Sequence, residues 1–256
     1  MSGILADLPI LTLLIAAAIT LFAGFVKGAV GFAMPMIMIS GLGSVLPADI
    51  ALAALILPTV VTNVFQALRQ GVGAAWKAVG QFRIYLIALL VFLIASAQLV
   101  RVLSPSTLYL LLGLPVVGFS LLQLVGWVPR LRSENRRRDE GLVGSFAGFV
   151  GGMSGVWGPP TVLFLTAIDT PKADQMRVQG VIYGLGAVAL LGAHVQSGVF
   201  TSHTAPLSAV MLVPALAGMV VGGWVHDRMP QVAFRRVTLV VLIVAGLNLV
   251  RRGLIG

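Results

Sequence analysis

The sequence predicts an all-α integral membrane protein built from two homologous halves. Of its 256 residues, 58% are hydrophobic and 10% are charged, whereas soluble domains carry about 25% charged residues. The apolar residues form long runs, and a membrane-spanning helix needs about 20 of them. A fourteen-residue segment also occurs twice with more than half of its positions identical. Because the runs take up most of the chain, we expect one membrane domain and no separate soluble domain.

Eight apolar runs follow one another along the chain, and their lengths favour helices over strands. They cover approximately residues 8–46, 48–68, 84–100, 107–128, 141–168, 178–195, 205–225 and 237–250. The first and fifth runs are interrupted by glycine and proline, at 28–35 and at 151–160. No Lys or Arg precedes the first run, so we expect the N-terminus to be retained rather than cleaved as a signal peptide.

An internal repeat links these two interrupted runs. Residues 22–35, FAGFVKGAVGFAMP, align without a gap on residues 146–159, FAGFVGGMSGVWGP, with eight of fourteen positions identical. Self-similarity of this kind predicts a duplicated architecture. We therefore divide the chain into a first membrane repeat (1–128), a basic cytoplasmic linker (129–140) and a second membrane repeat (141–256).

The spacing of the small residues in both copies resembles a known family. The pattern is Gly24, Gly28, Gly31 and Pro35 in the first copy, and Gly148, Gly152, Gly155 and Pro159 in the second. It is similar to the sulfite exporter TauE/SafE family, and the resemblance extends over both halves and the basic loop. The resemblance implies export of sulfite or a small organosulfonate across the cytoplasmic (inner) membrane, in a multi-pass protein.

The distribution of charge predicts an anionic substrate. Every Asp and Glu falls in a loop or at the end of a run, which argues against a cation site or a carboxylate proton relay. Lys27 lies deep in the first run beside the glycines, and an ammonium there is costly unless it meets an anion or a cavity. The alternative is that Lys27 extends its side chain to water.

The prolines at the two breaks predict short helices with exposed N-termini. Pro35 and the Pro159–Pro160 pair suit the first turn of a helix, so we expect helices to start near Met36 and Thr161. The unsatisfied N–H groups of a helix N-terminus bind anions, and glycines allow the anion to approach the backbone. The open alternative is that glycine and proline serve tight helix packing.

Two further helices carry polar stripes that could line a pathway. Asn63 and Gln66 share one face with Thr59 and Gln70, and Gln179 and Tyr183 share a face with His194. Polar side chains in membranes also often only hold helices together, and Trp157 could either gate the site or pack. The candidate substrate-binding residues are Lys27, Gly28, Gly31, Pro35, Asn63, Gln66, Gly152, Gly155, Trp157, Pro159, Thr161, Gln179 and Tyr183.

The basic residues distinguish two topologies. If every run crosses the bilayer, ten basic residues face the cytoplasm and six face outward. If the two broken runs turn back as hairpins, thirteen face the cytoplasm and three face outward, in better agreement with the positive-inside rule. Each half then crosses three times, so we expect inverted repeats with both termini outside.

The predicted function is therefore secondary transport of a small sulfur oxyanion, held at the midplane by half-helix N-termini. Alternatives are an uptake or proton-coupled permease, or a structural membrane protein. The chain has no Cys and no HExxH or GxSxG motif, so we expect no enzyme activity, no cofactor and no metal. The net charge is +9, and the basic residues lie in short loops. There they set the orientation of the protein in the membrane and contact lipids, so nucleic-acid binding is not indicated. The oligomeric state stays open.

Overall fold

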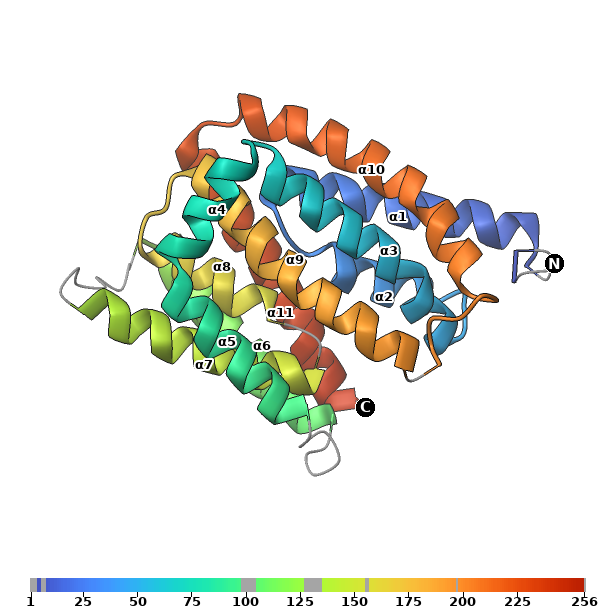
Figure 1. Cartoon of the computed structure of the whole chain (residues 1–256), viewed down its shortest axis with the longest axis horizontal. Coiled ribbons are helices and arrows are strands. Elements are labelled where there is room, and N and C mark those ends of the chain that lie inside the picture. Colours follow the sequence, from blue (N-terminus) through green and yellow to red (C-terminus); the bar gives the residue numbers. More distant parts are fainter. Residues whose placement is uncertain are drawn as a thin grey trace. The chain divides into compact units, whose positions relative to one another are not determined.

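The computed structural model describes residues 4–5, 8–97, 105–126, 135–154, 157–196 and 198–255, and the regular structure in these ranges is helical, without a β-strand (Figure 1). The helices are α1 (Ile10–Val30), α2 (Met34–Leu42), α3 (Ala48–Leu68), α4 (Val72–Gln81), α5 (Arg83–Ala97), α6 (Pro105–Leu124), α7 (Arg136–Ser154), α8 (Gly158–Ala167), α9 (Lys172–Gln196), α10 (Ala205–Arg228) and α11 (Gln231–Ile255). This confirms the predicted all-α class.

Several helices are long and apolar enough to cross a membrane. Within the described ranges these are Ile10–Val30, Asp49–Leu68, Ala205–Arg228 and Gln231–Ile255, and α4 with α5 forms a fifth candidate that is bent by 76°. Large apolar side chains such as Ile10, Leu14 and Phe22 on α1 are exposed, as expected for a surface in contact with lipid. The chain is thus a multi-pass membrane protein.

Both predicted breaks interrupt helices. The first run divides into α1 and α2, and the fifth divides into α7 and α8. The basic segment that we expected to be a linker is partly helical, because α7 already begins at Arg136, while residues 127–134 lie outside the described ranges. Helix α4 lies in a stretch that the sequence pattern left as a loop.

The described helices form two compact units that do not follow the sequence halves. Unit 1 comprises Met1–Val72 and Gln179–Met229, and unit 2 comprises Gly73–Val178 and Pro230–Gly256. Each unit therefore combines helices from both halves. In unit 1, α1 packs along α10, and in unit 2, α7 packs along α5.

In unit 1, α1, α3 and α10 run in the same direction (Figure 1). At one end, the Ile4 N–H donates to the His203 carbonyl oxygen over 3.4 Å, just before α10 begins. At the other end, Arg69 after α3 forms a 2.5 Å ion pair with Asp227 at the end of α10. Because α1 and α3 are parallel, residues 31–47, including α2, must bring the chain back.

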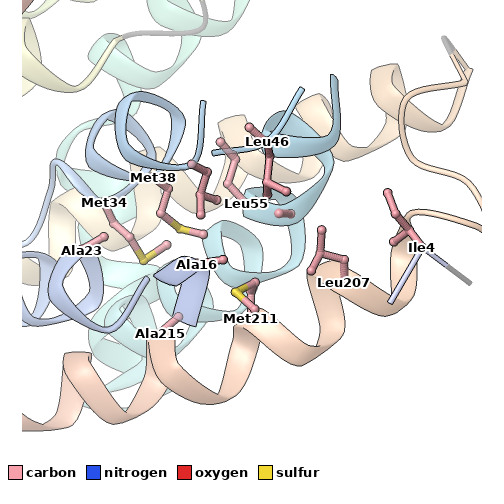
Figure 2. Close-up of a cluster of buried hydrophobic side chains, with 13 residues drawn as sticks. Ile4, Ala16, Ala23, Met34, Met38, Leu46, Leu55, Leu207, Met211 and Ala215 are labelled. Atoms are coloured by element: carbon pink, nitrogen blue, oxygen red, sulfur yellow. The ribbon is translucent and has the colours of Figure 1, made fainter. Parts of the chain in front are cut away.

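Helix α2 is held inside unit 1 by an apolar core (Figure 2). Met34, Met38 and Leu42 of α2 are fully buried. They belong to a cluster with residues of α1, α3 and α10, namely Ala16, Ala23, Ala51, Ala54, Leu55, Leu207, Met211 and Ala215. A helix of 9 residues spans about 14 Å, so α2 covers about half of an apolar layer about 30 Å thick.

Glycines set the close contact between α1 and α10. A Cβ at Gly24 would collide with the Ala215 carbonyl oxygen, and one at Gly222 would collide with the Phe25 carbonyl oxygen. In unit 2, a Cβ at Gly148, the repeat equivalent of Gly24, would collide with the Leu89 carbonyl oxygen on α5. Small residues allow such backbone contact between membrane helices, so the first helix of each half uses the repeated glycine for packing.

Pro58 leaves one carbonyl of α3 without its helical donor, and Ser208 of α10 bonds to that carbonyl. Pro58 lies inside α3 and has no N–H, so the Ala54 carbonyl loses its usual helical donor. The Ser208 hydroxyl donates to that carbonyl oxygen over 3.2 Å and accepts from the Leu57 N–H over 3.0 Å. Freed backbone groups in membrane helices require such partners.

We expect Ser208→Ala to destabilise the protein by about 1–3 kcal/mol, because the buried Ala54 carbonyl, which Pro58 already deprives of its helical donor, loses its partner. The loss should shrink when Pro58→Ala is added, since alanine restores the N–H that can bond Ala54. Thermal unfolding of the four proteins of this double-mutant cycle in detergent measures the coupling. Ser202→Ala, at an exposed turn position, serves as the control. Independent effects of the two substitutions would contradict this role of Ser208.

Candidate functional site

The first break is a sharp turn between α1 and α2. Gly31 has a φ of 88° and its N–H donates to the Lys27 carbonyl oxygen over 2.7 Å, which ends α1. Ala33, with a φ of 73°, precedes Met34, and Pro35 occupies the second position of α2. Glycine favours the left-handed conformation, whereas alanine there is strained. The sequence predicted that this helix starts near Met36, whereas α2 starts at Met34.

Lys27 is buried beside this break. Its side chain is 1% exposed, its ammonium donates to the Asn63 Oδ1, and Nζ lies 6.0 Å from the centroid of the Tyr183 ring. Lys27 therefore does not extend to water. Among the described residues of unit 1, the carboxylates Asp49 and Asp227 are exposed, so none of them shares the buried environment of Lys27.

Two buried glutamines of unit 1 lie on the helices that contact Lys27, Gln66 on α3 and Gln179 on α9. Gln66, which is 2% exposed, donates from Nε2 to the Gly31 carbonyl oxygen over 3.1 Å. Gln179 is fully buried, and neither polar atom of its amide has a hydrogen-bond partner among the described residues. The two predicted polar stripes thus lie in one unit with Lys27.

Other members of the predicted stripes bond to their own helix. Thr59 donates to the Leu55 carbonyl oxygen over 2.7 Å and Thr62 donates to the Pro58 carbonyl oxygen over 2.6 Å. Gly28 faces α10, because a Cβ there would collide with the Met219 carbonyl oxygen. These residues therefore have packing roles.

The second break is enclosed in unit 2. Trp157, Pro159 and Thr161 are buried. The Thr161 hydroxyl donates to the Trp157 carbonyl oxygen over 2.9 Å and lies 2.7 Å from the Tyr85 hydroxyl. Gly152 lies in α7, but its surroundings are not described, and Gly155 lies outside the described residues.

The two breaks offer different numbers of backbone donors. Helix α8 starts at Gly158, earlier than the expected start near Thr161. Its second and third positions are Pro159 and Pro160, which have no N–H. The first turn of α2 contains one proline, Pro35. A backbone anion site at α8 therefore has fewer donors than one at α2.

The sequence pattern does not point to two residues beside the breaks. His226 of α10 is 3% exposed and its Nδ1 lies 3.2 Å from the Ala29 carbonyl oxygen. Tyr85 is fully buried and stacks on Phe164, with ring centroids 5.7 Å apart. Both lie in helices of the opposite sequence half from the break they contact, so no local signal indicates their role.

The chemistry of the first break favours an anion. The site offers an ammonium, amide N–H groups and a helix N-terminus, which are the donors that an oxyanion needs. In the described ranges, no group of three or more His, Asp or Glu residues is placed to hold a metal ion.

A comparison with protein-family models gives one match, described as sulfite exporter TauE/SafE, over residues 16–249. The chain belongs to the sulfite exporter TauE/SafE family. No curated protein and no solved structure matches it significantly. Membership confirms the resemblance inferred from the spaced glycines. This TauE/SafE protein is thus a membrane transporter for small sulfur-containing anions, and the donors around Lys27 agree with that substrate class.

Proposed function

We propose that this protein exports sulfite or a small organosulfonate across the cytoplasmic membrane and that Lys27 binds the anion. The carrying observation is that Lys27 is 1% exposed and lacks a buried carboxylate in the described part of unit 1. An unpaired buried charge is costly, and an anionic substrate would supply the missing counter-charge. The family supports export as the direction.

The proposed site is centred on the first break. Lys27 supplies the charge, Asn63 orients the ammonium, and Tyr183 forms the wall that faces Nζ. Gly31 and Gln66 shape the turn, so that the N–H groups around Pro35 at the start of α2 can face the anion. Gln179 adds an amide from α9, while Gly28 keeps α1 against α10.

For unit 2, taken by itself, we propose a second and weaker anion contact at the second break, because this break repeats the motif of the first. Gly152 would let the backbone of α7 approach the anion, and Trp157 and Thr161 would shape the turn before α8. Pro159 leaves this turn with few N–H donors, so we expect weaker anion binding at the second break than at the first.

The proposal predicts that sulfur oxyanions stabilise the purified protein against heat. A ligand that binds only the folded state raises the melting temperature, by about 2.7 kcal/mol of stability at a hundredfold excess over Kd. Sulfite, sulfoacetate, sulfolactate, sulfate and thiosulfate form the panel, with chloride at equal ionic strength as the control. A panel in which no anion differs from chloride would remove the proposed substrate class.

The membrane topology that accompanies this proposal is the inverted repeat with hairpin breaks. It is supported by the parallel course of α1, α3 and α10 in unit 1, and by the pairing of Arg69 with Asp227 at one end. If every run crossed the bilayer, Arg69 and Asp227 would lie on opposite sides of the membrane.

Labelling of single cysteines tests this topology, because the chain has no native Cys. We expect an impermeant thiol reagent to label Ser202→Cys in intact cells but not Arg228→Cys, since the two exposed positions lie at opposite ends of α10. Permeabilised cells, in which both should react, provide the control. Labelling of Arg228→Cys but not Ser202→Cys would favour the all-crossing topology instead.

A further inference from the structure

The buried amide of Gln179 has no part in the packing hydrogen bonds of unit 1. Its side chain is 0% exposed, and both Nε2 and Oε1 lack a partner among the described residues. Exchanging the amide oxygen and nitrogen would not change this, because both atoms are unsatisfied. Such groups are costly when buried, so the amide requires an explanation.

Helices α1 and α3 define the level of the break. Lys27 of α1 contacts Asn63 of α3, and one turn further along both helices Gln66 contacts the Gly31 carbonyl. Positions near Gln66 are therefore level with the break.

Helix α9 brings Gln179 to the same level. Gly184 faces Asn63 and Gly180 faces Ala67, so α9 runs antiparallel to α3. Gln179 thus lies level with Gln66. It also shares a helix face with Tyr183, whose ring lies 6.0 Å from the Lys27 Nζ.

The two unsatisfied atoms have complementary needs. The amide N–H needs an acceptor, and the amide oxygen needs a donor. A sulfite dianion or a simple alkanesulfonate offers only acceptor oxygens. Hydrogen sulfite carries an added proton, and a hydroxyl- or amino-substituted sulfonate carries an O–H or N–H, so these anions can satisfy both atoms.

The charge of the site also favours anions such as hydrogen sulfite over the sulfite dianion. Lys27 is the one buried Lys or Arg among the described residues of unit 1, so a single negative charge would balance it, while a dianion would leave an excess charge in a dry environment. We propose that Gln179 makes the site selective for a singly charged sulfur oxyanion that carries one hydrogen-bond donor, of which hydrogen sulfite is the smallest. This inference rests on the proposed function.

The test compares ethanesulfonate with isethionate, which have the same charge and differ by one hydroxyl group. Affinities are measured by thermal stabilisation of the full-length protein in detergent. We expect isethionate to bind about tenfold more tightly, because one added hydrogen bond and one satisfied buried acceptor contribute on that order. Gln179→Met should bring the two affinities within about twofold of each other, whereas Gln123→Met, at another buried glutamine, should keep the difference.

Equal affinities of the wild-type protein for ethanesulfonate and isethionate would overturn the selectivity but leave the proposed function in place. This comparison needs only the wild-type protein, so it holds even if Gln179→Met fails to fold. If sulfite binds but neither sulfonate does, the affinity for sulfite is measured at pH values below and above the pKa that separates hydrogen sulfite from the sulfite dianion. We then expect affinity to follow the concentration of hydrogen sulfite, and affinity that follows the dianion would overturn the inference. Failure of sulfite and of both sulfonates to bind would instead remove the proposed function itself.

Discussion

Lys27→Met should weaken sulfite binding by about 2–5 kcal/mol, which corresponds to at least roughly a thirtyfold increase in Kd. The substitution removes the buried ammonium and keeps much of the apolar stem. Without anion, the melting temperature should stay equal or rise, because removing a charge that lacks a counter-ion offsets the lost hydrogen bond to Asn63. Melting curves with increasing sulfite measure both effects in the same samples.

Lys77→Met is the matched control for this experiment. Lys77 lies on α4 and is exposed, so its loss should leave both the melting temperature and the sulfite response close to those of the wild-type protein. A Lys27→Met protein that melts much lower without anion, yet responds to sulfite with unchanged affinity, would give Lys27 a purely structural role.

Gly28→Ala should destabilise the protein by about 1–3 kcal/mol, because the new Cβ would collide with the backbone of α10. Neither backbone can move without disturbing the other contacts between α1 and α10. Gly80→Ala should have the opposite effect and stabilise by roughly 0.5–1 kcal/mol, since Gly80 lies in α4 with open space around it and alanine is the better helix former.

Thermal unfolding and the yield of membrane-inserted protein measure these two alanine variants side by side. If Gly28→Ala retains wild-type stability but loses sulfite binding, Gly28 contacts the substrate rather than α10. Loss of stability with binding retained would favour the packing role that the structure gives it.

The sequence predicted the features that depend on local chemistry. Gly31 and Pro35 marked the first break because glycine favours a positive φ and proline suits a helix start. Lys27 was identified because a lone ammonium stands out in an apolar run. The polar stripe of Asn63 and Gln66 follows from the period of a helix.

Features that depend on distant contacts could not be read from the sequence. The contact of Ser208 with the backbone before Pro58 joins residues that are 151 positions apart. His226 beside Ala29 and Tyr85 beside Thr161 likewise join helices from opposite sequence halves. Helix α4 was missed because its apolar content is lower than that of the spans.

Sulfite transport by reconstituted proteoliposomes tests the central claim most directly. Vesicles with wild-type protein, Lys27→Met or Lys77→Met are loaded with unlabelled sulfite, and uptake of labelled sulfite by exchange is followed. At equal incorporation, we expect exchange with the wild-type protein and with Lys77→Met, and background exchange with Lys27→Met. Exchange by Lys27→Met at the wild-type rate, or wild-type exchange no faster than in empty vesicles, would contradict an anion site built on Lys27.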